Sequence, residues 1–277
     1  MKTKYLPNHE AYSRMNTDEL RSNFLVDDLF KAGELKLLYT DADRAIVGSA
    51  IPLGQGITLQ GSMQEMATEV FAERREIGVI NIGQPGKVTV DNKSFALDHG
   101  DALYIGKGSC NIKFLSDTAD APAEFYLLSF PAHVVYPTKL IRFSEGEVED
   151  LGQAESANMR RITKLIHPGV LDTCQVVMGI TSLASGQVWN TMPPHLHPRR
   201  MEVYMYFDLG QDDRVFHFMG KPYEIRTLLM KNKQVVISPS WSMHSAAGTG
   251  NYRFVWGMGG ENQAFDDMDF LSMNDLR

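Results

Sequence analysis

The chain has 277 residues, of which 43% are hydrophobic and 22% charged, which is ordinary for a soluble globular protein. The chain has 27 lysine and arginine residues and 34 acidic ones, which gives a net charge of −7. It therefore lacks the overall positive charge that is typical of proteins that bind nucleic acid. The N-terminus lacks the apolar core of a signal peptide, and no apolar run could span a bilayer. We therefore expect a cytoplasmic protein that binds neither nucleic acid nor membrane.

The first half predicts one short helix followed by strands. Asn16 is a helix cap with Glu19 three residues on, which predicts a helix reaching about Phe24. Gly, Asn, Asp and Pro then separate short apolar runs, and a helical turn falls within residues 60–75. This spacing is typical of an antiparallel sandwich or barrel, and the expected strands are 34–39, 45–51, 77–82, 87–90, 102–105 and 125–130.

The second half begins with a polar stretch. Residues 131–165 are expected to form a connector, and their acidic run 145–150 is interpreted as a solvated loop. Strands resume at 175–180 and continue to 253–258, and a short extension follows from residue 266. We expect two domains, 1–135 and 136–277. Cys110 and Cys174 have no C-x-x-C spacing, so we expect reduced thiols.

The second half also contains a set of potential metal ligands. His195 and His197 are two apart, so in a strand their side chains lie on one face. Glu202 lies an odd number of residues further on and can join them only if the chain bends, for which Pro198 supplies a reason. His244 follows another apolar strand and a Ser-Pro-Ser turn. Three imidazoles and a carboxylate are ligands for a divalent transition metal.

This ligand set leaves the metal and its role open. Zinc, iron, nickel and manganese all accept such ligands. A closed site of four ligands would be structural, but structural zinc usually recruits thiolates, and neither cysteine is near in sequence. An open site can instead polarise a carbonyl group as a Lewis acid. We expect one divalent metal per chain, with Zn²⁺ as the first choice.

The two halves look like repeats of one unit. The segment Arg74–Glu76 resembles Arg199–Glu202, since an apolar strand follows each of them. In this alignment Phe71 stands where the second half has His197, and Asn111 stands where it has His244. The first domain would therefore keep the fold without the metal site.

The ligand set resembles the metal site of cupins. A closer resemblance covers nearly the whole chain and is carried by residues 23–30, 195–207, 215–220, 236–245 and 254–262. Its most specific segment is Ser238–Ser245, with Trp241 inside it. These segments are similar to the 4-deoxy-L-threo-5-hexosulose-uronate ketol-isomerases, the 5-keto-4-deoxyuronate isomerases of pectin breakdown.

The resemblance implies both a fold and a reaction. The fold is an all-β bicupin, with two antiparallel β-barrel or jelly-roll domains related by duplication and a few short helices. The reaction is an aldose–ketose isomerisation that moves the carbonyl of 5-keto-4-deoxyuronate from C1 to C2 and gives 3-deoxy-D-glycero-2,5-hexodiulosonate. The family also implies a homohexamer. Either a side-chain base that shuttles a proton through an enediol or a metal-assisted hydride shift could carry the reaction.

The sequence does not identify the catalytic base. His217 is a weak candidate, because it enters the barrel if Phe216 and Phe218 face outward, and a packed core histidine is an equal alternative. Tyr204 shares the face of Glu202 and could hold a substrate hydroxyl. A positively charged side chain should bind the substrate carboxylate. The candidates are Arg160, Arg161, Lys164, Arg199 and Arg200, of which we select Arg161 and Arg200.

Other functions are compatible with the same four ligands. The chain could be another cupin metalloenzyme, such as a 5-deoxy-glucuronate isomerase or an Fe(II) dioxygenase. It could also be a non-catalytic sugar-acid-binding cupin, or a storage-type barrel in which the metal only fastens strands. The length of the resemblance favours the ketol-isomerase.

Overall fold

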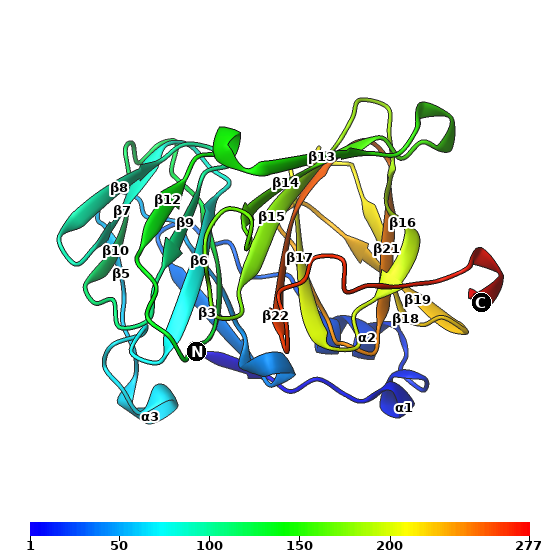
Figure 1. Cartoon of the computed structure of the whole chain (residues 1–277), viewed down its shortest axis with the longest axis horizontal. Helices are drawn as coiled ribbons and strands as arrows, with labels where there is room; N and C mark the ends of the chain where they lie inside the picture. Colours follow the sequence, from blue (N-terminus) through cyan, green and yellow to red (C-terminus); the bar gives the residue numbers. More distant parts are fainter. The chain divides into compact units, whose positions relative to one another are not determined.

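The computed structural model describes residues 1–277, and strands dominate it (Figure 1). The chain divides into two compact units, and their segments interleave along the sequence, in contrast to the single boundary expected at residue 135. The first unit comprises Met1–Lys4, Asp28–Glu147 and Lys164–Met178, and the second comprises Tyr5–Asp27, Val148–Thr163 and Gly179–Arg277. None of the helices is both long and apolar enough to cross a membrane.

The first unit is built on two sheets. The larger sheet has the order β1-β3-β4-β11-β6-β9-β12. Its strands are β1 (Lys2–Lys4), β3 (Leu35–Thr40), β4 (Ile46–Ala50), β6 (Arg75–Asn81), β9 (Ala102–Ile105), β11 (Phe125–Pro131) and β12 (Lys139–Ile141). The smaller sheet, of order β5-β10-β7-β8, contains β5 (Ile57–Leu59), β7 (Gly86–Val90), β8 (Lys93–Leu97) and β10 (Ile112–Ser116). Alternate residues of both sheets, including Val79, Val88, Leu103 and Phe114, share one apolar core.

The second pair of sheets carries the predicted metal ligands. The larger sheet has the order β13-β14-β15-β22-β17-β20-β2. Its strands are β2 (Leu25–Val26), β13 (Glu147–Leu151), β14 (Arg160–Ile166), β15 (Val177–Leu183), β17 (Arg200–Phe207), β20 (Val235–Ser238) and β22 (Arg253–Gly260). The smaller sheet, of order β19-β18-β21-β16-β23, contains β16 (Trp189–Leu196), β18 (Val215–Lys221), β19 (Glu224–Met230), β21 (Met243–Gly248) and β23 (Asp269–Phe270). The predicted all-β class is confirmed.

The helices are few and short. Asn16 caps α2 (Thr17–Phe24) through a capping box with Glu19, as predicted. The other helices are α1 (His9–Tyr12), α3 (Met63–Met66) and the 3-10 turns η1 (Ala42–Arg44), η2 (Phe143–Glu145), η3 (Ala154–Ser156) and η4 (Met273–Asp275). Within the second unit, the Tyr12 hydroxyl of α1 donates to the Met219 carbonyl at 2.9 Å, which fastens α1 to β18.

The predicted connector 131–165 is wrong, because it contains β12, β13 and the start of β14. The acidic run that was interpreted as a loop forms much of β13. That strand is the outermost of its sheet, and its residues alternate between exposed and half-buried from Val148 to Leu151. An edge strand with one solvated face tolerates charges, so composition alone hides it.

The ladder registers correct the alignment of the two halves. Glu202 pairs with Ser238, the last residue of β20, and Ile77 pairs with Ile105, the last residue of β9. Ile77 and not Glu76 therefore occupies the position of Glu202. A shift of one residue in a strand turns a side chain to the opposite face. The Glu76 carboxylate instead accepts hydrogen bonds from the Tyr104 hydroxyl at 2.8 Å and from the backbone N–H groups of residues 174–176 at 2.6–2.8 Å.

Asn111 does not occupy the position of His244 either. It lies exposed just before β10, with a positive φ of 48°, whereas His244 is the second residue of β21 and is buried. Phe71, which was aligned with His197, belongs to the apolar core of the first unit. Similar strand and turn patterns led to this alignment, although the hydrogen-bonded registers differ.

Candidate metal centre

Four side chains from three strands and one turn converge in the second unit. His195 lies near the end of β16 and pairs with His244 of β21 across the ladder. β16 ends at Leu196 and β17 begins at Arg200, so the chain reverses at Pro198, where a bend was predicted. The Arg200 N–H closes this turn on the His197 carbonyl at 3.0 Å. The turn brings Glu202 of β17 to the two histidines despite its odd spacing.

The potential ligand atoms of these residues lie close together. Nε2 of His195 is 3.1 Å from Nε2 of His197 and 3.2 Å from Nε2 of His244. Oε2 of Glu202 is 3.1 Å from Nε2 of His197 and 3.0 Å from Nε2 of His244. All four atoms lie within 4.8 Å of one another. Two ligands at right angles around an ion about 2.1 Å away would lie about 3.0 Å apart, so the spacing fits a first-row divalent metal.

The protonation states also fit a metal. Burial lowers the pKa of His195 and of His244, so both imidazoles are held neutral. Burial alone would raise the pKa of Glu202, but the neighbouring His244 and His197 outweigh it and hold this pKa well below its usual range. Oε2 of Glu202 is buried and accepts no hydrogen bond of adequate geometry. A cation among these atoms would satisfy the carboxylate and the imidazole lone pairs together.

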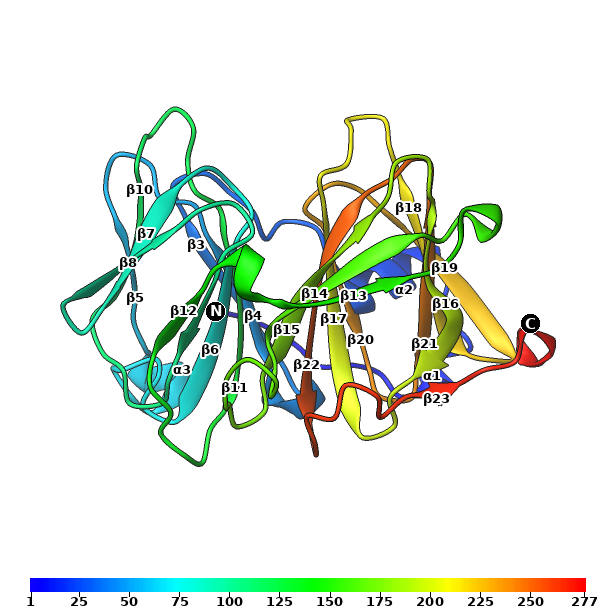
Figure 2. The ribbon, with the colours of Figure 1, turned by 45° about the horizontal axis from the view of Figure 1, so that its top comes forward.

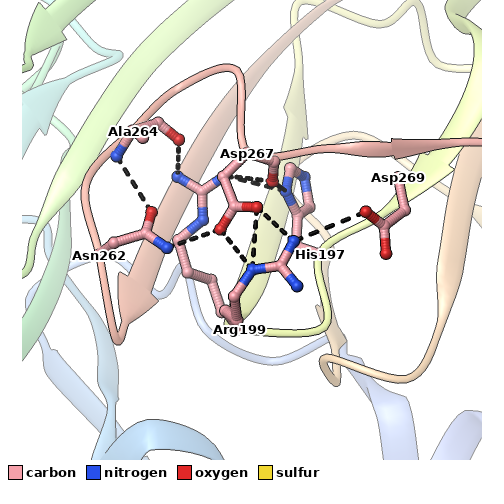
Figure 3. Close-up of polar contacts among 7 residues, drawn as sticks. His197, Arg199, Asn262, Ala264, Asp267 and Asp269 are labelled. Carbon is pink, nitrogen blue, oxygen red and sulfur yellow. Dashed lines mark hydrogen bonds and ion pairs between the residues drawn. The ribbon is translucent and has the colours of Figure 1, made fainter.

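Outer contacts hold the imidazole rings in place. Nδ1 of His197 is 3.1 Å from the Asp267 carbonyl oxygen (Figure 3). It also lies 3.0 Å from Nη2 of Arg200. Nδ1 of His244 is 3.4 Å from Oγ of Ser238. Such contacts leave Nε2 as the free ligand atom and fix the orientation of the ring.

The cluster lies in the wall of a pocket of about 350 Å³, which is large enough for a small sugar acid. Three of the four residues line it, and aromatic and apolar side chains supply much of the remaining wall. The other lining residues include Glu149, Arg160, Ile162, Thr181, Thr191, Tyr204, Phe254, Trp256, Phe265, Met268 and Phe270.

Tyr204 and Thr191 form a polar pair in this wall. The Tyr204 hydroxyl makes side-chain hydrogen bonds with Thr191 and with Glu202. Burial first, and then the charge of Glu202, raise the pKa of Tyr204 well above its usual value, so the phenol keeps its proton. Thr191 has a φ of 51°, which is rare for a β-branched residue. Local strain of this kind is common at binding sites, where the surrounding structure maintains it.

The basic residues considered for binding the substrate carboxylate have different surroundings in the structure. Arg161 is exposed, binds Asp150 at 2.7 Å and 2.8 Å, and is absent from the pocket lining. Arg200 is 1% exposed and lies behind His197, outside the lining. Lys164 pairs with Glu147 at 2.9 Å, and Arg199 pairs with Asp267. Arg160 is the basic side chain that lines the pocket.

His217 points into the second unit, whereas its neighbour Phe216 is 41% exposed. Its Nδ1 is 2.7 Å from the Tyr206 hydroxyl, and its buried Nε2 has no hydrogen-bond partner. Burial lowers the pKa of His217 to about 3. It does not belong to the pocket lining, but it lies near the cluster, where His244 disfavours its charge and Glu202 favours it.

Sequence reasoning missed several pocket residues. Glu149 was assigned to a solvated loop, although its alternation with Val148 is the pattern of a strand. Met268 and Phe270 belong to the tail that the sequence predicts as a short extension from residue 266, and Phe265 directly precedes it. The ring of Phe270 is 5.6 Å from that of His195, and Phe265 is 5.3 Å from Trp256. The spaced apolar residues of the tail were the available signal.

Known proteins resemble this chain over most of its length. Two relatives named 4-deoxy-L-threo-5-hexosulose-uronate ketol-isomerase come from Lachnoclostridium phytofermentans and Halalkalibacterium halodurans. The first is 52% identical over 94% of both chains, and the second is 47% identical over the full length of both. An Escherichia coli relative of the same name is 48% identical, covering 97% of this chain and 98% of the relative.

Solved structures share the fold at low identity. An IolB-like protein from Salmonella typhimurium superposes with a TM-score of 0.68 at 16% identity, covering 90% of this chain and 97% of that one. A mutant of Bacillus subtilis oxalate decarboxylase gives a TM-score of 0.56 at 11% identity, covering 82% and 71%. The model of the KduI/IolB family matches residues 55–273. With this match and the identity to its relatives, the chain belongs to the KduI/IolB family.

Proposed function

We propose that this protein is a metal-dependent ketol-isomerase that converts 4-deoxy-L-threo-5-hexosulose uronate into 3-deoxy-D-glycero-2,5-hexodiulosonate. One observation carries the proposal: three imidazole nitrogens and a buried carboxylate oxygen without a hydrogen bond face one another in the wall of a pocket. The names of relatives that are 45–52% identical supply the substrate. They favour this function over the dioxygenase and the binding-protein alternatives.

We propose that His195, His197, Glu202 and His244 hold one Zn²⁺ per chain. When bound there, the ion would supply Lewis-acid polarisation of the substrate carbonyl and stabilise negative charge on its oxygen. The donor set of three nitrogens and one oxygen also suits other first-row metals. Neutral imidazoles and an ionised carboxylate are the forms that such an ion requires.

Arg160 is the residue proposed to bind the substrate carboxylate. It lines the pocket, and its guanidinium is anchored at the Asn158 carbonyl at 3.0 Å. Burial lowers the pKa of Arg160, but arginine remains charged at neutral pH. A partly desolvated guanidinium in the wall of a largely apolar pocket gives strong, oriented hydrogen bonds to a carboxylate.

Glu149 is the residue proposed to move the proton between C1 and C2. Apart from Glu202, it is the carboxylate that lines the pocket. It would remove the proton from C2 as the C1 oxygen gains one, and would return a proton to C1 as the C2 hydroxyl loses its own, with an enediol between the two steps. The Tyr204 hydroxyl, which keeps its proton, would donate a hydrogen bond to a substrate oxygen.

The proposal extends to the origin of the two units and to where and in what oligomeric state the protein acts. We propose that the two units descend from a duplication in which the first copy carries no metal site, with Ile77 at the position of Glu202. We also propose that the protein acts in pectin breakdown in the cytoplasm, as a homohexamer.

The test is a turnover assay on zinc-loaded protein. The product of an oligogalacturonide lyase is added, and loss of its aldehyde is followed before chelation, after chelation and after zinc is restored. The proposal predicts activity that disappears with the metal and returns with it. No turnover by fully metallated protein would refute the isomerase function. A parallel reaction in D₂O separates the mechanisms, because a proton shuttle places deuterium at C1 whereas a hydride shift does not.

A further inference from the structure

The segment of residues 262–271, here called the strap, crosses the pocket beside the candidate ligands. Figure 2 shows it running from the end of β22 to β23, which lies next to β16. Phe270 pairs with His195 in that ladder, and the Leu271 N–H donates to the Pro194 carbonyl at 3.0 Å. Phe265, Met268 and Phe270 all line the pocket. The position of the strap therefore determines the shape of the pocket.

The outer side of the strap is fastened by a charged contact. Nε of Arg199 donates to both carboxylate oxygens of Asp267, at 2.9 Å and 2.8 Å (Figure 3). Asn262 supports the same carboxylate from within the strap, with its Nδ2 2.6 Å from Oδ2. A carboxylate held by a guanidinium and an amide has a well-defined orientation.

The inner side is fastened by Arg200, which is 1% exposed. Its Nη1 donates to the Ala264 carbonyl at 2.6 Å, and its Nη2 donates to the Asp267 carbonyl at 2.9 Å. The same Nη2 lies 3.0 Å from Nδ1 of His197. One buried guanidinium thus touches two strap carbonyls and one candidate ligand.

The chemistry of His197 connects the strap to the cluster. Its Nε2 faces the other ligand atoms, so Nδ1 carries the ring proton whenever Nε2 acts as a ligand. A guanidinium has no acceptor, so this proton goes to the Asp267 carbonyl, 3.1 Å away. Arg200 donates to the same oxygen and holds it in place. The orientation of His197 and the observed position of the strap therefore share one carbonyl group.

We propose that Arg200 is a positioning residue that ties the strap to His197, so that strap closure and metal affinity are coupled. This inference rests on the proposed metal centre and adds that the position of the strap affects how tightly the centre binds its ion. Coupling of this kind is reciprocal: a bound ion favours the closed strap, and a closed strap tightens metal binding by the same factor. Closure also excludes water from the pocket while the substrate reacts.

The test measures zinc affinity of the full-length protein by competition with a chelator. Asp267→Ala removes the carboxylate that Arg199 binds most closely and leaves His197 and the Asp267 backbone carbonyl in place. The weaker contact of Arg199 with Asp269, at 3.5 Å, also remains. We expect the substitution to weaken zinc binding by about fivefold or more. Arg200→Lys keeps the charge but cannot bridge two carbonyls, and we expect a loss of about 10- to 100-fold.

A matched control comes from the first unit. Arg142 likewise contacts a carbonyl, that of Ala96 at 3.0 Å, and a carboxylate, that of Asp101 at 2.7 Å. Arg142→Lys should leave zinc affinity within about twofold of the wild type. If the Asp267→Ala protein folds and binds zinc as tightly as the wild type, the coupling is refuted, whatever the buried Arg200 variant does.

Hydrogen exchange adds a readout that a general loss of stability would not reproduce. The Asp267 N–H donates to the Ala264 carbonyl at 3.1 Å, within the strap. The Leu271 N–H donates to the Pro194 carbonyl at 3.0 Å. In the wild type, zinc should slow exchange at both amides, and in Asp267→Ala this zinc-dependent slowing should shrink. Equal exchange with and without zinc would overturn the inference. A wild type that binds no zinc would refute the metal centre itself, which is a distinguishable result.

Discussion

Oε2 of Glu202 lies 3.0 Å from Nε2 of His244, although the two residues belong to strands of different sheets. Glu202 lies on β17 and His244 on β21, so their contact joins the two sheets of the second unit at one point. Both residues are almost fully buried, and the carboxylate oxygen accepts no hydrogen bond. This relationship indicates a site whose atoms are arranged for a ligand rather than for one another.

His244→Ala should abolish stoichiometric metal binding and turnover together, because it removes one of four ligands and leaves Glu202 without its nearest partner. The protein should stay soluble, since the change removes a buried polar group and leaves the strands intact. Metal analysis of purified protein, with a turnover assay beside it, checks the prediction. A full equivalent of metal in this variant would show that the ligand assignment is wrong.

Arg160→Gln should lower kcat/KM by about 10- to 150-fold, the usual range for losing a hydrogen bond to a charged group. Most of the loss should fall on KM if the guanidinium binds the substrate carboxylate in the ground state. Arg161→Gln is the matched comparison, because Arg161 is exposed and pairs with Asp150. Equal losses in the two variants would contradict the assignment to Arg160.

Glu149→Gln should lower kcat by about 100- to 10,000-fold, because it removes the proposed proton carrier. Metal content should not change, since Glu149 is not one of the four clustered residues. Steady-state kinetics and metal analysis of the same preparation test both statements. Turnover at the wild-type rate would exclude Glu149 as the base.

The pH dependence of stability should report on His217. Its pKa is about 3 in the folded protein against 6.5 as the ordinary value, so the unfolded chain binds more protons between these limits. Its contribution to stability is therefore complete above about pH 6.5 and declines as the pH falls towards 3. Tyr204 and Tyr206 of β17 pack against this imidazole, and His244 of β21 disfavours its charge.

Urea unfolding of zinc-free protein at several pH values measures this decline. His217→Gln keeps a polar group opposite Tyr206 but does not titrate. The variant should therefore lose less stability than the wild type on acidification from pH 6.5. Parallel curves for the two proteins would show that His217 contributes nothing to the dependence.

Local spacing accounts for much of what could be predicted. Asn16 and Glu19 predict a capped helix because a capping box depends on two residues three positions apart. The bend at Pro198 follows from the restricted backbone of proline. His195 and His197 were expected together as residues two apart in one strand. Their Nε2 atoms do meet, although β16 ends at Leu196 and His197 lies in the turn that follows. The family resemblance and the all-β class are likewise confirmed.

Position within the sheets could not be predicted in the same way. Arg160 and Arg161 are neighbours in β14, and alternation says only that they face opposite sides. Which side meets the pocket depends on how that strand is paired and on what packs against it. For the same reason Glu76 was aligned with Glu202, although the register places Ile77 there.

By itself the sequence determined the strand-rich fold and the four residues of the candidate metal centre, because strand spacing, turn signals and residue types carry both. Its resemblance to the ketol-isomerases over long segments indicated the family. The tertiary structure decided which further groups reach that centre. Glu149 comes from an edge strand that resembles a loop in composition, and Arg200 acts through carbonyl groups of the strap. Every residue has a backbone carbonyl, so residue types cannot predict which carbonyl binds a given side chain. Only the folded chain shows that His197 and the strap both contact Arg200.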